Sequence, residues 1–184
     1  MSTSPDHLHY LRLALNEARK SPPKSTNFCV GACLVSPSIS AQPLVTGFTL
    51  ECEGNTHAEQ CCFIKLAYAL NPPSSSVQSS EGIKFPEATV GPHLPADTIL
   101  YTTMEPCNKR SPGNTPCTER ILAVRREDES PAIKTVVVGV SEPDTFVGVN
   151  EGKRKLQDAG IEVVHVSGLE DEILRVAKAG HVEE

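Results

Sequence analysis

Tryptophan is absent from this chain, aromatic residues make up only 4% of it, and no apolar run reaches membrane-spanning length. Residues 1–6 lack the basic and apolar segments of a secretory signal, so we expect a cytoplasmic protein, with nuclear access left open. Positive charge is also scarce. The formal net charge is −6, which argues against a surface built for a nucleic-acid backbone. We therefore expect a small-molecule partner, and neither a nucleic acid nor a membrane.

The seven cysteines are odd in number and unevenly spaced. In a reducing compartment, such a set argues against a disulfide framework and for metal binding, catalysis or core packing. A length of 184 residues with 39% hydrophobic content suits one unit with a sizeable core. We expect a single domain over residues 1–184.

Helical and strand patterns alternate along most of the chain. Helices are expected at 9–20, 57–70, 116–125, 151–159 and 169–179, and strands at 28–35, 43–48, 98–103, 135–140 and 162–166. The first two strands read as a hairpin, whereas the later strand–helix–strand units predict parallel pairing. Strands that are apolar on both faces predict helices on each side of the sheet. The expected fold class is α/β, a three-layer α/β/α sandwich with a central mixed sheet of about five strands.

Residues 71–95 interrupt this alternation. The segment is rich in proline, serine and glycine and shows no sustained periodicity. We interpret it as a surface insertion within the domain rather than as a linker between domains.

A histidine, a glutamate and two cysteines carry the chemistry. His57 and Glu59 stand one residue apart, and Cys107 follows a proline and precedes Cys117. One histidine and two cysteines that bind zinc, with a glutamate that moves protons, are the pattern of zinc-dependent nucleobase deaminases. Three protein ligands leave a fourth position for water, as in catalytic zinc sites. The usual spacing has two residues between the cysteines, and this chain has nine.

Plainer interpretations exist for the same residues. Thr56 and Glu59 also fit a helix capping box. Thr115, by contrast, supports the zinc site: as the cap of a helix with Pro116 as its first residue, it would place Cys117 where the helix dipole favours a thiolate. Cys52 is a rival fourth ligand that would close the zinc site and make it structural.

Several segments closely resemble the riboflavin-pathway deaminases, the diaminohydroxyphosphoribosylaminopyrimidine deaminases of the cytidine deaminase superfamily. The resemblance runs from about residue 10 to residue 180, without 71–95, and it includes the long spacing between the cysteines. The Asn-Lys-Arg sequence after Cys107 resembles the fungal form. The segments are NFCVG (27–31), GNTHAE (54–59), TMEPC (103–107), GNTPC (113–117), EPD (142–144) and DAGIE (158–162).

The resemblance implies hydrolytic deamination of a phosphorylated diamino-ribitylamino-pyrimidinone in riboflavin biosynthesis, with one Zn²⁺ per chain and a homodimer. Glu59 would be the catalytic proton shuttle, and His57, Cys107 and Cys117 the metal ligands. The candidate substrate-binding residues are Asn27, Asn55, Asn108, Lys109, Arg110, Glu142 and Asp144. Either Lys109 or Arg110 suits a phosphate, because a dianion near the metal needs compensating charge.

Two other functions fit part of the sequence. A nucleoside or tRNA deaminase shares the zinc motif, although a tRNA enzyme should carry a basic patch that this acidic chain lacks. A zinc-stabilised binding protein without catalysis would hold the metal and release no ammonia.

Overall fold

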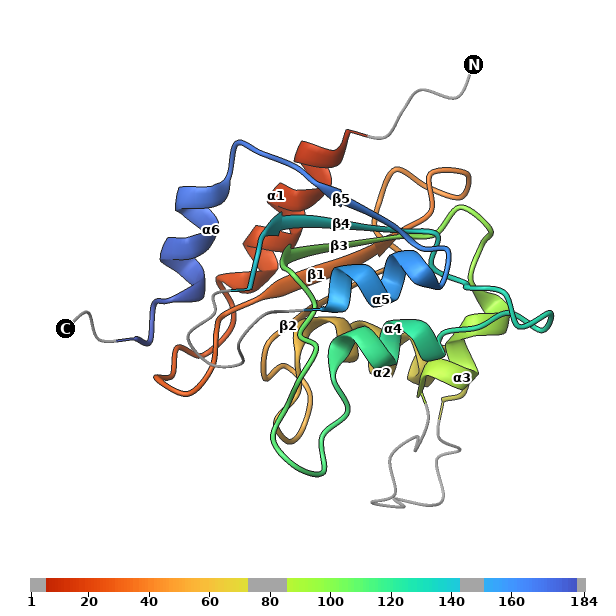
Figure 1. The fold of residues 1–184 in the computed structure, drawn as a ribbon, viewed down its shortest axis with the longest axis horizontal. Coiled ribbons are helices and arrows are strands. Elements are labelled where there is room, and N and C mark those ends of the chain that lie inside the picture. Colours follow the sequence, from red (N-terminus) through yellow and green to blue (C-terminus); the bar gives the residue numbers. More distant parts are fainter. Residues whose placement is uncertain (1–5, 73–85, 143–150, 182–184) are drawn as a thin grey trace.

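The computed structural model describes residues 6–72, 86–142 and 151–181 (Figure 1). Within these ranges helices and strands alternate, and no helix combines the length and the apolar character needed to span a bilayer. The strands are β1 (Gly31–Val35), β2 (Val45–Phe48), β3 (Ile99–Met104), β4 (Thr135–Val140) and β5 (Glu162–His165). The helices are α1 (His7–Ala18), α2 (Ala58–Leu70), α3 (Pro86–Val90), α4 (Cys117–Ala123), α5 (Gly152–Asp158) and α6 (Glu170–Ala177), with a 3₁₀ turn at Gly91–His93.

The strands form one mixed sheet in the order β2-β1-β3-β4-β5. β1 pairs antiparallel with both β2 and β3, whereas β3, β4 and β5 are parallel. The change of direction follows from the connections, since a loop of nine residues without a helix (36–44) joins β1 to β2, and helices separate β3, β4 and β5. The predicted mixed five-stranded sheet is confirmed.

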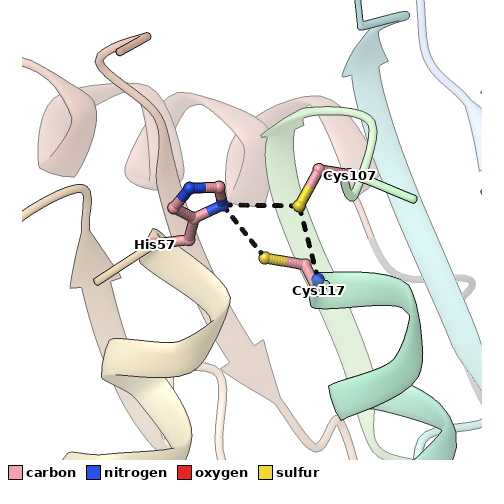
Figure 2. Close-up of side chains that lie close together, drawn as sticks. All are labelled: His57, Cys107 and Cys117. Atoms are coloured by element: carbon pink, nitrogen blue, oxygen red, sulfur yellow. Dashed lines mark hydrogen bonds between the residues drawn. The ribbon is translucent and has the colours of Figure 1, made fainter. Parts of the chain in front are cut away.

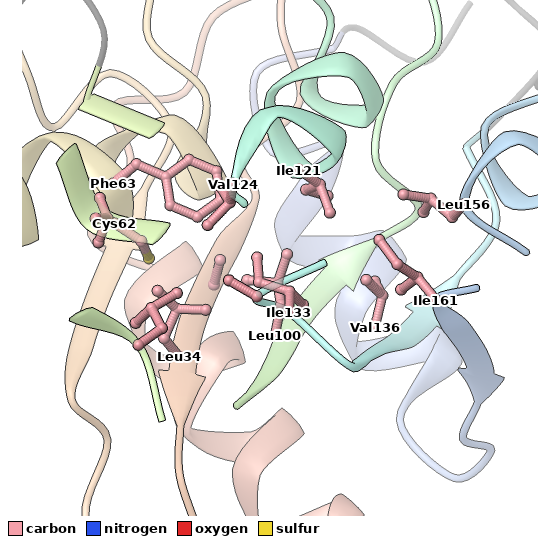
Figure 3. Close-up of a cluster of buried hydrophobic side chains, with 14 of the residues drawn as sticks. Leu34, Cys62, Phe63, Leu100, Ile121, Val124, Ile133, Val136, Leu156 and Ile161 are labelled. Carbon is pink, nitrogen blue, oxygen red and sulfur yellow. The ribbon is translucent and has the colours of Figure 1, made fainter. Parts of the chain in front are cut away.

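Helices cover both faces of the sheet (Figure 1). α1 and α6 lie on one face, and α2, α3, α4 and α5 lie on the other. Successive strand residues therefore alternate between two cores: Leu100 belongs to the core under α2 and α4, and Tyr101 to the core under α1. Figure 3 shows the first of these cores, in which Phe63 and Ile121 project toward the sheet. The three-layer α/β/α prediction is confirmed, because apolar residues on both faces of the central strands require cover on both sides.

The first strand is shorter than expected. The apolar run predicts a strand over 28–35, but β1 begins at Gly31. The amides before it are satisfied outside the sheet: Cys29 N–H donates to Ala177 O at 2.9 Å, and Val30 N–H donates to Thr49 Oγ1 at 3.0 Å. Residues 26–28 consequently lie beyond the ladder, on the rim where the site is built.

The interpretation of 71–95 as a surface insertion is wrong for its last part. α3 occupies Pro86–Val90, and Pro86, Glu87 and Val90 are buried. Glu87 Oε1 accepts from Arg120 Nη1 at 2.6 Å, which ties this segment to α4. A five-residue helix is too short to show a helical period in the sequence, so only the tertiary contacts reveal it. Residues 73–85 lie outside the described ranges.

Gly31 allows α1 to lie close against β1. A Cβ atom at this position would stand 1.9 Å from Ala14 O and 2.4 Å from Ala18 N. Both neighbours are backbone atoms of α1, so a local side-chain rotation does not relieve the overlap.

We predict that Gly31→Ala lowers the free energy of unfolding by about 1–3 kcal/mol, the usual cost of overpacking a core. Urea unfolding, followed by circular dichroism, measures this change in the free energy of unfolding. The matched control is Gln157→Ala on the exposed side of α5, which should stay within about 0.5 kcal/mol of the parent. Equal unfolding midpoints for the two variants would contradict the close approach.

Candidate functional site

Two helix N-termini and the end of a strand meet at one edge of the sheet (Figure 2). His57 is the N-cap residue of α2, and Cys117 is the first residue of α4. Cys107 lies in the loop that follows β3. Thr118 N–H donates to Cys107 O at 3.1 Å, which fastens this loop to the first turn of α4. The fold thereby brings three ligand residues from three separate segments to one point.

The three side chains are spaced as zinc ligands. His57 Nδ1 lies 3.5 Å from Cys107 Sγ and 3.3 Å from Cys117 Sγ, and all three ligand atoms lie within 4.8 Å of one another. A tetrahedral zinc with Zn–S near 2.3 Å and Zn–N near 2.0 Å places its nitrogen and sulfur ligands about 3.5 Å apart. These residues therefore fit one Zn²⁺, with one position left for a non-protein ligand.

Cys52 does not join this group of ligand atoms in the part of the chain that the structure describes. Its thiol instead forms a hydrogen bond with Cys61, which raises the pKa of Cys52 and lowers that of Cys61 to about 6. The geometry therefore does not support the rival interpretation, in which Cys52 would be a fourth zinc ligand.

Cys107 is prepared to act as a thiolate. Hydrogen bonding from the Cys117 side chain, and then from His57, lowers the pKa of Cys107 to about 4 against the opposing effect of burial. The Cys117 backbone N–H also points at Cys107 Sγ, at 3.4 Å. Zinc binds the thiolate form of cysteine, so this arrangement favours metal binding at neutral pH.

Glu59 lies on the first turn of α2 and is 2% exposed. Burial raises its pKa, although the neighbouring His57 opposes the shift. Glu59 Oε1 lies 3.2 Å from Thr102 Oγ1, which can donate to it from β3. A buried carboxyl with a raised pKa suits a group that accepts and returns protons near neutral pH.

Both predicted helix caps are wrong. Thr56 Oγ1 donates to Cys52 O at 2.9 Å instead of accepting from the first turn of α2, and Glu59 is held by Thr102 rather than by the Thr56 amide. Thr115 does not cap α4 either, since Pro116 is the N-cap residue and no side chain caps the helix. The first turns of both helices instead carry metal ligands and Glu59, which face the site.

A pocket of about 530 Å³ opens beside the ligands. Its lining includes five of the predicted substrate-binding residues, together with His57, Glu59 and Cys107; the five are Asn27, Asn55, Lys109, Arg110 and Glu142. Asn108 does not line it: this side chain is 7% exposed, and its Oδ1 has no hydrogen-bond partner among the described residues. Asp144 lies outside the described residues.

Sequence reasoning missed other lining residues, namely Thr26, Phe28, Val30, Thr49, Met104, Glu105 and Ser111. Most of them neighbour a residue that the motifs single out, so proximity to a motif is the signal that could have found them. Thr49 is different. It lies after β2, and its Oγ1 accepts a hydrogen bond from Val30 N–H, which holds it beside the pocket. No sequence pattern predicts this contact.

Arg110 and Lys109 have different surroundings. Arg110 Nη2 donates to Asn55 O at 2.5 Å, and Nη1 donates to Gln60 Oε1 at 3.2 Å and to Thr115 O at 3.4 Å. The bonds to Asn55 and Gln60 fasten the loop between the two cysteines to the start of α2, and the bond to Thr115 lies within the loop. Lys109 is exposed and has no ion-pair partner among the described residues.

The fold and the site define an α/β protein whose three-ligand zinc site opens to a pocket that holds a buried glutamate. Residues 4–139 match the model of the cytidine and deoxycytidylate deaminase zinc-binding region. The chain belongs to this deaminase family.

The chain is similar to the Rib2 deaminase of Aspergillus oryzae, a C-terminal deletion mutant solved at pH 4.6. The two are 43% identical, the match covers 97% of this chain and 93% of that one, and the TM-score is 0.79. A second structure of that deaminase, in complex with DARIPP, is 41% identical, covers 97% and 92% of the two chains, and has a TM-score of 0.76.

A similar protein of Schizosaccharomyces pombe is the diaminohydroxyphosphoribosylamino-pyrimidine deaminase, 36% identical over 176 residues. The match covers 96% of this chain and 36% of that protein, so this chain spans about a third of that relative's length. The family resemblance seen in the sequence is confirmed.

We predict that Cys117→Ala reduces bound zinc from about one ion per chain to near zero, because two remaining ligands do not hold the metal. Cys52→Ser is the matched control and should keep its zinc. Metal analysis after exhaustive dialysis measures both, and circular dichroism shows whether each variant is folded. Loss of zinc from Cys52→Ser would show that the ligand set has been assigned incorrectly.

Proposed function

We propose that the protein is a zinc-dependent hydrolytic deaminase of a phosphorylated diamino-ribitylamino-pyrimidinone in riboflavin biosynthesis. The amine on ring carbon 2 is replaced by oxygen, and ammonia is released. The observation that carries the proposal is the three-ligand zinc set with buried Glu59 in the same pocket. The DARIPP complex of the A. oryzae relative and the name of the S. pombe relative support the substrate class.

His57, Cys107 and Cys117 would hold the zinc, which when bound supplies Lewis-acid activation of water at neutral pH. Glu59 performs the proton transfers. Its carboxylate takes one proton from water and delivers it to a ring nitrogen, then takes the remaining proton from the hydroxyl group newly bound to ring carbon 2 and delivers it to the departing amine. Thr102 Oγ1 lies 3.2 Å from Oε1 of this carboxylate and 3.0 Å from Met104 O, and its single hydroxyl hydrogen can be donated to either. Water thus supplies the new ring oxygen, and the amine leaves as ammonia.

Within this proposal, Lys109 is the phosphate contact and Arg110 is the anchor of the loop. Lys109 lines the pocket without an ion-pair partner among the described residues, whereas the guanidinium of Arg110 is engaged with Asn55, Gln60 and Thr115. An ammonium group suits a phosphate as a point charge. Asn27, in the same pocket, is the proposed hydrogen-bond partner of the pyrimidine.

A nucleotide deaminase is the second candidate, because the matching family model is that of cytidine and deoxycytidylate deaminases. The formal net charge of −6 disfavours a tRNA substrate.

The proposal includes a homodimer, because the family that the chain resembles suggests one. A cytoplasmic location is proposed because all seven cysteines are free, as in a reducing compartment.

Ammonia release from a panel of substrates tests the function. The zinc-loaded protein should turn over the phosphorylated diaminopyrimidinone with the ribityl side chain faster than the ribosyl form, and leave cytidine, deoxycytidylate and tRNA unchanged.

Glu59→Gln should keep its zinc and lose at least about a hundredfold in kcat, the range of general acid–base catalysis. The exposed change Glu53→Gln is its control. Turnover by Glu59→Gln at the parent rate would remove the proton-shuttle role, and release from deoxycytidylate alone would favour the second candidate.

Substitution of the two basic residues separates their roles. Lys109→Ala should raise KM for the phosphorylated substrate about tenfold or more, because a charge-assisted hydrogen bond is lost. Its effect should disappear with the dephosphorylated substrate. Arg110→Lys keeps the charge but breaks the fastening of the loop, so it should lower zinc retention and the unfolding midpoint. If Arg110→Lys alone raised KM in a phosphate-dependent way, the assignment would be reversed.

A further inference from the structure

One wall of the pocket is held from outside the sheet. Asn27 and Phe28 line the pocket, and they precede β1 without joining its ladder. The end of α6 and the chain after it support them instead. Cys29 N–H donates to Ala177 O at 2.9 Å, and a Cβ atom on Gly180 would stand only 2.3 Å from Lys24 N. The two segments therefore pack backbone against backbone.

His181 contacts both wall residues at once. Its Nε2 lies 3.0 Å from Asn27 O, and because a carbonyl oxygen only accepts, Nε2–H is the donor. Its ring stacks on Phe28, with centroids 4.9 Å apart and planes inclined by 23°. One side chain thereby fixes the backbone of Asn27 and the ring plane of Phe28.

The Asn27 side chain has an unused donor. Its Nδ2 is buried and has no hydrogen-bond partner among the described residues. A buried donor without a partner is unfavourable in the free protein, and that cost is removed when a ligand supplies an acceptor. In a pocket of this size beside the zinc ligands, the carbonyl oxygen or a ring nitrogen of a pyrimidinone is an acceptor of the right kind.

We propose that His181 is a positioning residue for substrate binding: it holds Asn27 and Phe28 so that the amide donates to the pyrimidinone and the phenyl ring packs against the ring face. The inference rests on the proposed function and deepens it. His181 itself does not line the pocket. Its effect therefore falls on the affinity for the ring and not on the chemical step, which Glu59 carries out.

Steady-state kinetics with zinc-loaded protein tests the proposal. His181→Ala should raise KM about tenfold, as expected for misplacing one hydrogen bond and one ring contact, with kcat within about twofold. His181→Gln keeps a donor at the Nε2 position and His181→Phe keeps the stacked ring, so each should restore part of the loss. His165→Ala is the matched control, because this exposed histidine lies on β5 and does not line the pocket; its KM should equal that of the parent.

The outcomes separate a positioning role from a merely structural one. An unchanged KM in His181→Ala, or a fall in kcat or zinc content at unchanged KM, would overturn the proposal even if the unfolding midpoint dropped. Nitrogen-15 NMR of the ligand-free protein gives a second readout that does not need activity. His181 should show the Nε2–H tautomer, and the Asn27 side-chain amide signals should shift in His181→Ala and return toward the parent in His181→Gln.

If the parent protein released no ammonia from any pyrimidine, the proposed function would fail, while the NMR readout would still decide whether His181 holds the wall. If the parent were active and His181→Ala left both KM and the Asn27 amide signals unchanged, only the positioning proposal would fail.

Discussion

The convergence of three donor atoms from three segments is the constraint on which the rest of the structure depends. His57 and Cys117 belong to the starts of two different helices, and both must come within zinc-ligand distance of Cys107 after β3. This requires α2 and α4 to lie side by side on one face of the sheet, with their N-termini at the same edge. The close packing of α2 on β2 contributes to it: a Cβ atom on Gly47 would stand 2.4 Å from Ala58 O, in the first turn of α2.

Hydrogen bonds from Arg110 hold the nine-residue loop between the two cysteines in place. Arg110 donates to Gln60 on α2 and to Asn55 just before that helix, so the added length stays attached to the segment that carries His57 and Glu59. The wide spacing therefore need not loosen the metal site. It also places Lys109, an exposed basic residue in an acidic protein, in the lining of the pocket.

The sheet, the layers and the residues of the zinc group could be predicted from the sequence, because apolar runs and a spaced motif are local signals. What could not be predicted depends on partners distant in the chain. Thr56 and Thr115 satisfy the sequence rules for helix caps, yet the side chain of Glu59 is taken by Thr102 on β3, and α4 begins at a metal ligand. The sequence also does not predict the contacts of His181, because Asn27 and Phe28 lie more than 150 residues before it in the chain.

α2 also separates the metal site from the connection to α3. Its N-terminus carries His57 and Glu59, whereas its C-terminus at Leu70 leads into the segment that returns at Pro86. A helix of 13 residues is about 20 Å long, so this connection begins far from the metal ligands. Its ends are secured by α2 and by the Glu87–Arg120 ion pair. The two ends of the connection therefore meet different parts of the site: the first joins α2 at the end opposite His57 and Glu59, and the second is tied to α4, the helix that begins with Cys117.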